Sequence, residues 1–300
     1  MTQNNLIDVD EILGLEDHEL IDRDGEANER IKRFLNEKLP VITVDGNIGF
    51  GKTRIAKTIA KHGAVISLED DTDPVLTQLY YEVGRDVFGT ILQAYLLAKR
   101  AAQSWDGFLE VVSGRPFCTD RSPYGELMFI DALNKIEDEN GKKNIEDEAA
   151  AGLYKAFELV FSRGKEYKNA LLNYKSDLLD STHVARSKLL NFKQKGGSPP
   201  PDILVLLHGD RQVAWNRLSV RGRDYEGSGD STQGLPEKLH MALHCAYDNF
   251  EEIVRTKGLY DGQIIYLEQP KVNLATKKGE LVLLESLLAL EDRLDNRNGL

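Results

Sequence analysis

Residues 46–53 read Gly46-Asn47-Ile48-Gly49-Phe50-Gly51-Lys52-Thr53, and this stretch matches the phosphate-loop pattern G-x-x-x-x-G-K-[ST]. Before it runs an apolar, β-branched segment, residues 41–45, that is typical of a buried strand. After it, residues 54–61 repeat apolar side chains at helical spacing. A strand, a glycine-rich turn and a helix in this order favour a phosphate-binding loop over an ordinary turn that matches by chance.

The residue types of this loop suit an anionic ligand. Glycines let the backbone curl closely around a phosphate with its N–H groups pointing inward, and the N-terminus of the following helix adds partial positive charge. Lys52 supplies a point charge for the outer phosphates, and the hydroxyl of Thr53 is a ligand that Mg²⁺ accepts. We therefore expect a nucleoside triphosphate and Mg²⁺ to bind at residues 46–53.

The overall composition indicates an acidic globular protein. The chain has 300 residues, 41% of them hydrophobic, and a formal net charge of −11, which argues against a general nucleic-acid binder. No apolar run is long enough to span a membrane, and the acidic residues 1–26 resemble neither a signal nor a transit peptide. Cys118 and Cys245 are expected to be reduced core residues, which favours a cytoplasmic protein.

Strand and helix patterns alternate along the chain, which predicts an α/β fold with a five-stranded parallel sheet covered by helices on both faces. The expected strands are residues 41–45, 64–69, 116–120, 202–208 and 263–268. The expected helices are residues 29–37, 54–61, 75–83, 86–104, 123–137, 211–220, 236–256 and 278–292. Residues 1–26 are expected to form a weakly ordered arm or a peripheral helix. Residues 138–196 are charged and helical in pattern, and the Pro-Gly stretch 196–201 favours a loop that feeds the next strand over a domain linker.

Polar groups follow three of the expected strands. The phosphate loop follows the first, Glu69 ends the second, and Asp120-Arg121 ends the third. In a parallel sheet, the active cleft lies outside the carboxyl ends of the strands. We therefore expect these groups to converge in one catalytic site.

Further motifs make the chain resemble the deoxyribonucleoside kinase family, whose motifs occur here in the family's order between residues 41 and 270. Besides the loop and Glu69, these are Gln93-Ala94-Tyr95, Asp120-Arg121-Ser122, the lid-like Arg221-Gly222-Arg223-Asp224-Tyr225-Glu226, and Gly234-Leu235-Pro236. The resemblance implies a P-loop kinase that phosphorylates the 5′-hydroxyl of a deoxyribonucleoside.

The resemblance also implies roles for the residues around the phosphates. Glu69 looks like the general base for the 5′-hydroxyl, Arg121 like the residue that holds Glu69 and the 5′-oxygen, and Asp120 like a magnesium ligand. Arg217, Arg221 and Arg223 resemble lid arginines that close over the transferring phosphoryl group. In isolation, these arginines would be read as a solvated helix end, and Glu69 as one more acid in an acidic run.

Other residues resemble those that bind the nucleoside. Glu226 and Tyr81 resemble the pair that binds the sugar 3′-hydroxyl, with Tyr80 a competing assignment, and Gln93 resembles the residue that bonds the base edge. Arg100 and Glu126 resemble the pair found in members that prefer deoxycytidine or purine deoxynucleosides, although those members usually have Asp in place of Glu. Arg100 and Glu126 could equally form a structural ion pair, and Gln93 and the tyrosines could be core or surface residues.

The sequence departs from the family pattern in three places. Residues 70–73 are Asp-Asp-Thr-Asp where the family usually has Pro and then an aromatic residue, the lid has extra residues 227–232, and segment 138–201 is longer than usual. His240 and His244 are four residues apart on an expected helix, but no third ligand accompanies them, so a zinc site is not expected.

Together these observations predict an acidic N-terminal arm and helix, residues 1–37, and one P-loop kinase domain, residues 38–300, with an enlarged helical insertion at 138–201. The predicted activity uses ATP or another nucleoside triphosphate with Mg²⁺, and binding to nucleic acid or to a membrane is not expected. The resemblance to the family further implies a homodimer. One alternative is a nucleoside monophosphate kinase of the thymidylate kinase type, which the acidic residues 69–73 disfavour. The other is an inactive structural relative, which the intact motif residues disfavour.

Overall fold

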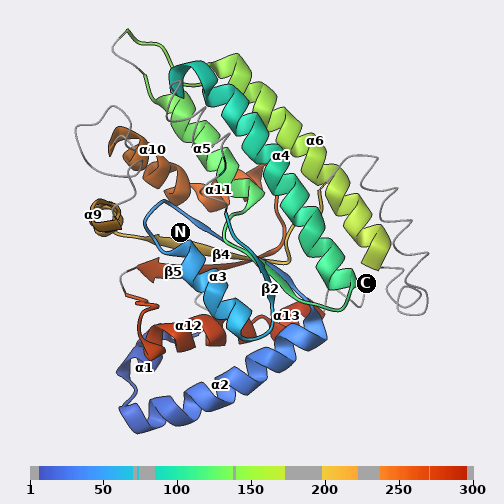
Figure 1. Cartoon of the computed structure of the whole chain (residues 1–300), viewed down its shortest axis with the longest axis vertical. Helices are drawn as coiled ribbons and strands as arrows, with labels where there is room; N and C mark the ends of the chain where they lie inside the picture. Colours follow the sequence, from blue (N-terminus) through green and yellow to red (C-terminus); the bar gives the residue numbers. More distant parts are fainter. Residues whose placement is uncertain are drawn as a thin grey trace.

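The computed structural model describes residues 7–69, 73, 85–137, 140–172, 198–221, 237–269 and 271–295. At its centre lies a five-stranded sheet with the strand order β2-β3-β1-β4-β5 (Figure 1). Every pair of neighbouring strands is parallel, which confirms the predicted α/β architecture. The strands are β1 Val41–Gly46, β2 Val65–Ser67, β3 Phe117–Thr119, β4 Ile203–Gly209 and β5 Gln263–Gln269.

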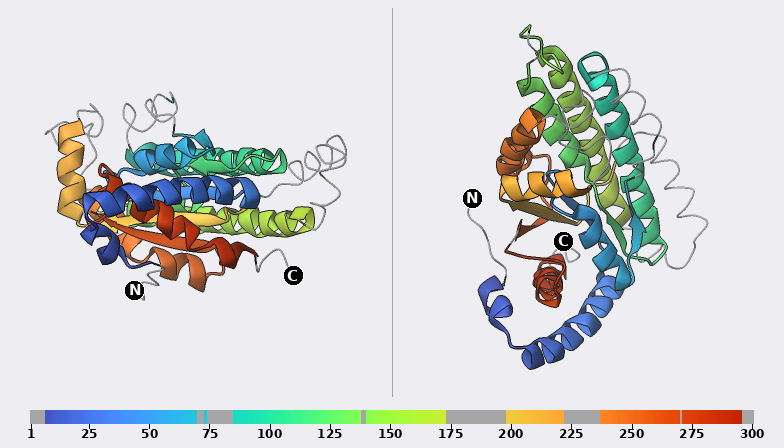
Figure 2. Two further views of the ribbon diagram at one scale, coloured as in Figure 1. Left: turned by 90° about the horizontal axis from the view of Figure 1, so that it is seen from below. Right: turned by 60° about the vertical axis from the view of Figure 1, so that its left-hand side comes forward.

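Helices cover both faces of the sheet, and the two faces have separate apolar cores. Along β4 the side chains alternate between them: Ile203, Val205 and Leu207 join one core, and Leu204 and Leu206 join the other. The first core contains α1 Val9–Gly14, α2 Asp17–Lys38, α3 Lys52–Lys61, α12 Lys277–Leu288 and α13 Glu291–Asp295. The second contains α4 Arg85–Val112, α5 Pro123–Lys135, α6 Asp147–Leu172, α9 Arg211–Arg221, α10 Glu237–Asp248 and α11 Phe250–Thr256. Figure 2 shows these helices on opposite sides of the sheet.

The N-terminal region is more ordered and more buried than the sequence suggests. Helices α1 and α2 cover most of residues 9–26, so for this part of the chain the expected peripheral helix is confirmed and the alternative of a weakly ordered arm is wrong. Helix α2 begins at Asp17 instead of residue 29. A capping box at Glu16 and Glu19 fixes the start of α2. Its buried side chains, which include Ile31 and Phe34, recur at helical spacing between the acids and face the core that α12 shares.

Other helix boundaries also differ from those predicted. Helix α4 continues to Val112, and the helix expected over residues 236–256 divides at Asn249 into α10 and α11. The helix expected at 75–83 lies outside the described residues. Cys118 is buried as expected, but Cys245 is exposed on α10, so its assignment to the core was wrong.

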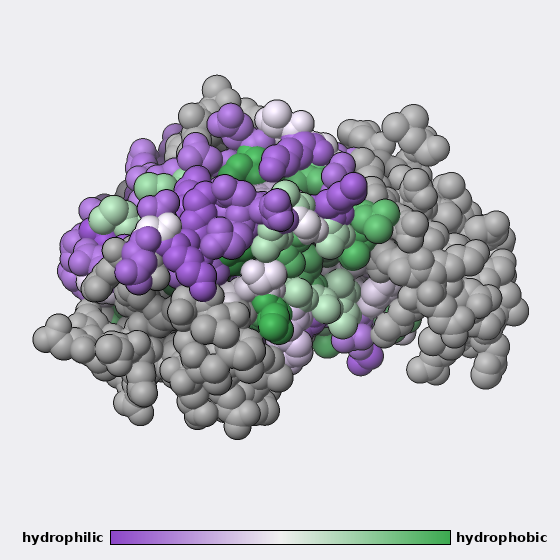
Figure 3. All heavy atoms as spheres, turned by 90° about the horizontal axis from the view of Figure 1, so that it is seen from above, coloured by the Kyte–Doolittle hydropathy of each residue, from purple (hydrophilic) through white to green (hydrophobic). Residues whose placement is uncertain are grey.

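The helical layer formed by α4, α5 and α6 leaves some apolar surface exposed. Two large apolar side chains on it, Ile91 on α4 and Leu159 on α6, are 55% and 52% exposed. Figure 3, a view of the molecule from above, shows apolar surface beside a strongly polar region. Among the described residues, no helix is both long enough and apolar enough to cross a membrane.

Candidate active site

The carboxyl ends of β1, β2 and β3 bring the three predicted polar groups together. Strand β3 lies between the other two, with Thr119 opposite Thr43 of β1 and opposite Ser67 of β2. Since the strands are parallel and in register, the residues that follow them emerge at the same edge of the sheet. The phosphate loop, Glu69 and Asp120 therefore share one site.

The phosphate loop has the glycine geometry that its sequence requires. Gly49 and Gly51 have φ angles of 91° and 88°, a region that other residues rarely adopt. A Cβ atom on Gly49 would also lie 2.5 Å from the carbonyl oxygen of Ala214 in α9. The backbone of this loop can therefore keep its shape only with glycine at position 49.

Lys52 begins α3 and curls back over the loop. Its Nζ donates hydrogen bonds to the carbonyl oxygens of Gly46, at 2.9 Å, and Asn47, at 3.0 Å. Burial, together with the charge of Arg121, lowers the pKa of Lys52 to about 7, although nearby carboxylates act in the opposite direction. An anionic ligand at the loop would restore its full charge.

Asp120 connects the phosphate loop to Glu69. Its Oδ2 accepts a hydrogen bond of 2.6 Å from the hydroxyl of Thr53, and its Oδ1 accepts one of 2.7 Å from the backbone N–H of Glu69. A hydroxyl and a carboxylate side by side are oxygen ligands of the kind that Mg²⁺ prefers. The donor set of Thr53 and Asp120 therefore fits the metal that the sequence predicted.

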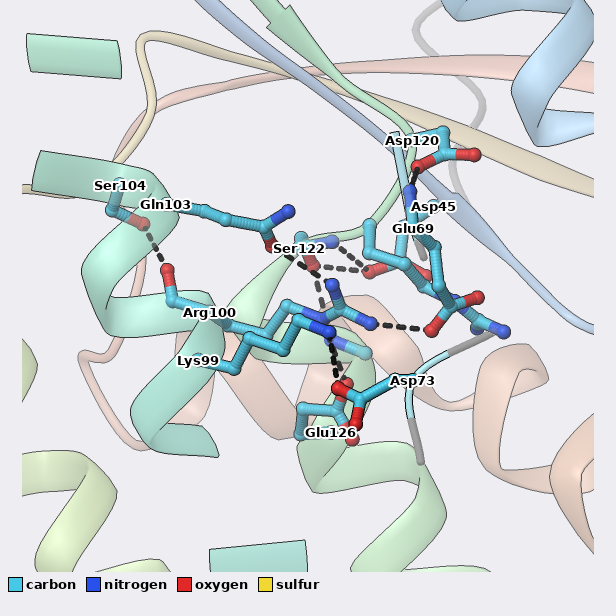
Figure 4. A network of polar contacts seen from close by, with 12 residues as sticks. Asp45, Glu69, Asp73, Lys99, Arg100, Gln103, Ser104, Asp120, Ser122 and Glu126 are labelled. Atoms are coloured by element: carbon cyan, nitrogen blue, oxygen red, sulfur yellow. Dashed lines mark hydrogen bonds and ion pairs between the residues drawn. The ribbon is translucent and has the colours of Figure 1, made fainter. Parts of the chain in front are cut away.

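Two arginines hold the carboxylate of Glu69, and Figure 4 shows the contact made by Arg100. Arg100 Nη2 lies 2.5 Å from Oε1, and Arg121 Nε lies 3.0 Å from Oε2. Burial alone would raise the pKa of Glu69, but Arg121 and Arg100 outweigh it and lower the pKa to about 2. Because the Glu69 side chain is still 27% exposed, an incoming hydroxyl can reach this ionised carboxylate.

Arg100 also binds Glu126, its predicted partner. The side chain of Arg100 is 1% exposed, and its Nε lies 3.1 Å from Oε1 of Glu126 while its Nη1 donates to Gln103. Burial raises the pKa of Glu126, although Arg100 and Arg121 oppose the change. The sequence predicted the pair of Arg100 and Glu126 but missed that Arg100 joins this pair to Glu69.

Several buried polar atoms near these residues are left without partners. Within the described part of the chain, Oε1 of Gln93, Oε2 of Glu126 and Nη1 of Arg121 make no hydrogen bond. Gln93 lies seven residues before Arg100, on the same face of α4. Buried polar atoms usually have partners, so a polar ligand beside α4 and α5 would complete the hydrogen bonding here.

Comparisons with known proteins agree with this chemistry. A sequence model of deoxynucleoside kinases matches residues 42–168. The chain is 29% identical over 191 residues to the deoxyadenosine/deoxycytidine kinase of Bacillus subtilis (strain 168). The aligned region covers 63% of this chain and 69% of the relative. These similarities support a deoxynucleoside kinase family for the chain. They indicate a phosphotransferase.

Two further likenesses differ in the share of the chain that they cover. The mitochondrial NADH dehydrogenase [ubiquinone] 1 alpha subcomplex subunit 10 of Bos taurus is 32% identical over 127 residues, 35% of this chain and 37% of the relative. A solved structure of deoxyadenosine kinase from M. mycoides with bound dCTP has a TM-score of 0.47 and 20% identity, and it covers 76% of this chain and 89% of its own.

The kinase site also contains a buried carboxylate that the sequence analysis missed. Asp45, at the end of β1, accepts hydrogen bonds from the N–H of Gly46 at 2.8 Å, the hydroxyl of Tyr247 at 2.6 Å, and both the N–H and the hydroxyl of Ser122. Burial, and then the charge of Asp45, raise the pKa of Tyr247 well above its usual value. Asp45 therefore ties the start of the phosphate loop to the N-cap of α5 and to α10. A side chain at Gly125 would collide with this carboxylate.

Most of the predicted lid and sugar residues of the kinase fall outside the described part of the chain. Tyr80, Tyr81, Arg223 and Glu226 lie there, and so does the side chain of Arg221, the last residue of α9. Arg217 is described. It is exposed on α9, with Nη1 3.4 Å from Oε1 of Gln269 at the end of β5.

Proposed function

We propose that this kinase transfers the γ-phosphoryl group of ATP, or of another nucleoside triphosphate, to the 5′-hydroxyl of a deoxyribonucleoside. The observation that carries the proposal is the hydrogen-bonded bridge from Thr53 through Asp120 to Glu69. It holds the carboxylate that faces the acceptor at a fixed place beside the loop that faces the donor. Phosphoryl transfer depends mainly on such positioning and on charge stabilisation.

The donor side of the site is formed by residues 46–53. Its backbone N–H groups and the N-terminus of α3 would hold the phosphates, and Lys52 would turn from the carbonyls of the loop to the outer phosphate oxygens. Thr53 and Asp120 would hold Mg²⁺, which supplies positive charge to the phosphates. Arg217, Arg221 and Arg223 are proposed to add charge from the lid.

The acceptor side is centred on Glu69. In the transfer step, the 5′-oxygen forms a bond to the γ-phosphorus, the bond from this phosphorus to the β–γ bridging oxygen breaks, and a nucleoside diphosphate leaves. The proton of the hydroxyl passes to Glu69. A carboxylate as acidic as Glu69 is a weak base, but the loose transition state of phosphoryl transfer requires little proton removal before the bond forms. Arg100 and Arg121 keep its two oxygens oriented for this task.

The unpartnered atoms of Gln93 and Glu126, together with the guanidinium of Arg100, support a base-binding role for these residues. A base with a polar edge, such as cytosine or a purine, could pair with them, and the Bacillus relative bears the name of a deoxyadenosine/deoxycytidine kinase. Tyr81 and Glu226 are proposed to bind the sugar 3′-hydroxyl. The homodimer and the cytoplasmic location stay predictions.

The likeness to a subunit of NADH dehydrogenase favours a second candidate, a structural role without catalysis. The hydrogen-bonded set of Lys52, Thr53, Glu69, Asp120 and Arg121 supports the kinase reading instead. A nucleoside monophosphate kinase would need basic residues for the phosphate of its acceptor near β2, where this chain has Glu69 and Asp73.

A turnover panel separates these candidates. The four deoxynucleosides and their monophosphates are each incubated with ATP and Mg²⁺, and the products are separated by chromatography. We expect monophosphates from the nucleosides that have a polar base edge. We also expect Glu69→Gln to lower kcat at least about 100-fold, while the exposed control Glu29→Gln has no effect. Diphosphates formed only from monophosphates would support the monophosphate kinase, and absence of any product would support the structural role.

A further inference from the structure

The phosphate loop is packed between two helices, α9 and α10. Gly49 lies against the backbone of Ala214 in α9, and the ring of Phe50 lies 6.4 Å from that of His244 in α10. Helix α10 also exchanges two hydrogen bonds with the loop. Nδ2 of Asn47 donates to the carbonyl of His240 at 3.1 Å, and Nε2 of His240 lies 3.1 Å from the carbonyl oxygen of Ile48. Both Asn47 and His240 are buried, so the two bonds are shielded from water.

The hydrogen bond of His240 has a defined direction. A carbonyl oxygen can only accept, so the hydrogen must be on Nε2 of the imidazole. Burial lowers the pKa of His240 to about 4, against the effect of its bond to Ile48, so the ring is neutral and carries one hydrogen. Its Nδ1 has no partner among the described residues. His240 therefore donates its one ring N–H to the phosphate loop. The ring of Trp215 packs beside it, with the two ring centres 5.1 Å apart.

His240 contacts the carbonyl of the Ile48–Gly49 peptide, and this peptide plane can flip. Glycine at position 49, with φ of 91°, tolerates more than one backbone conformation, so the Ile48–Gly49 peptide plane is not fixed by its own residues. In a trans peptide, the carbonyl and the following N–H point in opposite directions. The N–H of Ile48 already donates to Oδ1 of Asn47 at 2.7 Å. The N–H of Gly49 belongs to the same peptide as the carbonyl that His240 contacts, so this contact sets its direction.

We infer that His240 is a positioning residue for phosphate binding. By holding the carbonyl of Ile48 toward α10, it turns the N–H of Gly49 to the opposite side, into the loop, where a triphosphate would accept its hydrogen bond. Asn47 fixes the other side of the same contact by bonding to the backbone of α10. This inference rests on the proposed function only in that residues 46–53 bind a nucleoside triphosphate.

Calorimetric titration of the full chain with ATP and Mg²⁺ tests this role without relying on turnover. His240→Phe keeps a ring against Trp215 but removes the donor. Loss of the bond and of the loop orientation should weaken ATP binding about tenfold, the equivalent of about 1.4 kcal/mol. His240→Gln can donate from a similar position and should stay within about threefold of wild type. The matched control His244→Phe, one turn later, keeps its ring contact with Phe50 and should bind like wild type. Binding of the deoxynucleoside should not change in any of the three.

Equal ATP binding by wild type and a folded His240→Phe would overturn the inference alone, as would equal losses in the Phe and Gln variants. Failure of the wild-type chain to bind any nucleoside triphosphate would overturn the proposed function and the inference with it.

A second measurement uses the unmodified chain, in case His240→Phe does not fold. In ¹⁵N-labelled protein, the amide signal of Gly49 should move downfield when ATP binds, while that of Ile48, which already donates to Asn47, should move little. The reverse pattern would show that the Gly49 N–H faces away from the phosphates, and it would refute the role of His240.

Discussion

Replacing Arg100 with methionine should destabilise this kinase strongly, because one guanidinium serves two carboxylates. Arg100 is 1% exposed and lies 3.1 Å from Glu126, which is 4% exposed, and 2.5 Å from Glu69. Removing one partner of a buried ion pair typically costs about 3–5 kcal/mol. Glu126 can escape part of this cost by taking up a proton, since its pKa is already raised. We therefore expect a loss in the free energy of unfolding of about 3 kcal/mol at pH 7.

A double-mutant cycle shows whether the stability lost in Arg100→Met comes from leaving the buried carboxylate of Glu126 without its partner. Glu126→Leu alone should cost less than Arg100→Met, because Arg100 keeps Glu69 as a partner. The double variant Arg100→Met/Glu126→Leu should be more stable than Arg100→Met, since an apolar pair replaces an unpaired buried charge. Urea unfolding followed by circular dichroism measures all four chains. Strict additivity, or a loss below about 1 kcal/mol for Arg100→Met, would refute the buried pairing.

The same variant also separates a structural ion pair from a base-reading pair. If Arg100 and Glu126 only support the fold, Arg100→Met should lower kcat/KM for all deoxynucleosides by the same factor. If they contact the base, use of deoxycytidine or purine deoxynucleosides should fall more than use of thymidine, while the KM for ATP should not change. An unchanged ratio among the four substrates would refute base recognition by this pair.

Three further predictions concern the ionised groups of the site. The pKa of Glu69 is about 2 when folded against an ordinary 4.5, so its stabilising effect is present above pH 4.5 and is lost as the pH falls toward 2. Between pH 6 and pH 3, the free energy of unfolding of wild type should therefore fall by about 2 kcal/mol more than that of Glu69→Gln. Urea titration at the two pH values measures both losses. Lys52 has a pKa of about 7, so it should take up roughly one proton when ATP binds at pH 8. Calorimetry in buffers of different ionisation enthalpy measures this proton uptake. An uptake near zero would contradict the prediction. Tyr247→Phe removes the 2.6 Å bond to the buried carboxylate of Asp45 and should cost about 1.5–3 kcal/mol in thermal unfolding, whereas Tyr154→Phe, which loses only a 3.4 Å bond, should cost less.

The parts of the site that could be predicted were those encoded by local pattern. The loop 46–53 is recognisable because its function requires a strand, particular glycines and a helix in one contiguous stretch. Glu69 and Asp120 could be placed at the same edge because parallel strands deliver their carboxyl ends there. In each case, one run of residues carries both the structure and the chemistry.

The contacts that were missed join residues far apart in the chain. Asp45 looks like an ordinary strand end, and its partners Ser122 and Tyr247 come from positions 77 and 202 residues later. The bond from Arg100 to Glu69 depends on how α4 packs against the sheet, which no sequence spacing specifies. The first part of α2 was missed because its few buried side chains, Leu20 and Ala27, are spread among many charged ones.

The charges of the described site bear on what the donor still needs. Around the loop, the described part of the chain places the cations Lys52, Arg100 and Arg121 among the carboxylates of Asp45, Glu69, Asp120 and Glu126. Both arginines are already engaged by Glu69, and Lys52 is only partly charged at neutral pH. These residues therefore have little positive charge to spare for a triphosphate that carries several negative charges. We propose that Mg²⁺ held by Thr53 and Asp120, together with groups outside this set, supplies the missing positive charge. We propose Arg217, Arg221 and Arg223 of the lid-like segment as further sources of positive charge. On this proposal, the site should bind the magnesium complex of ATP more tightly than free ATP, because the metal would offset the charges of the carboxylates and of the phosphates together.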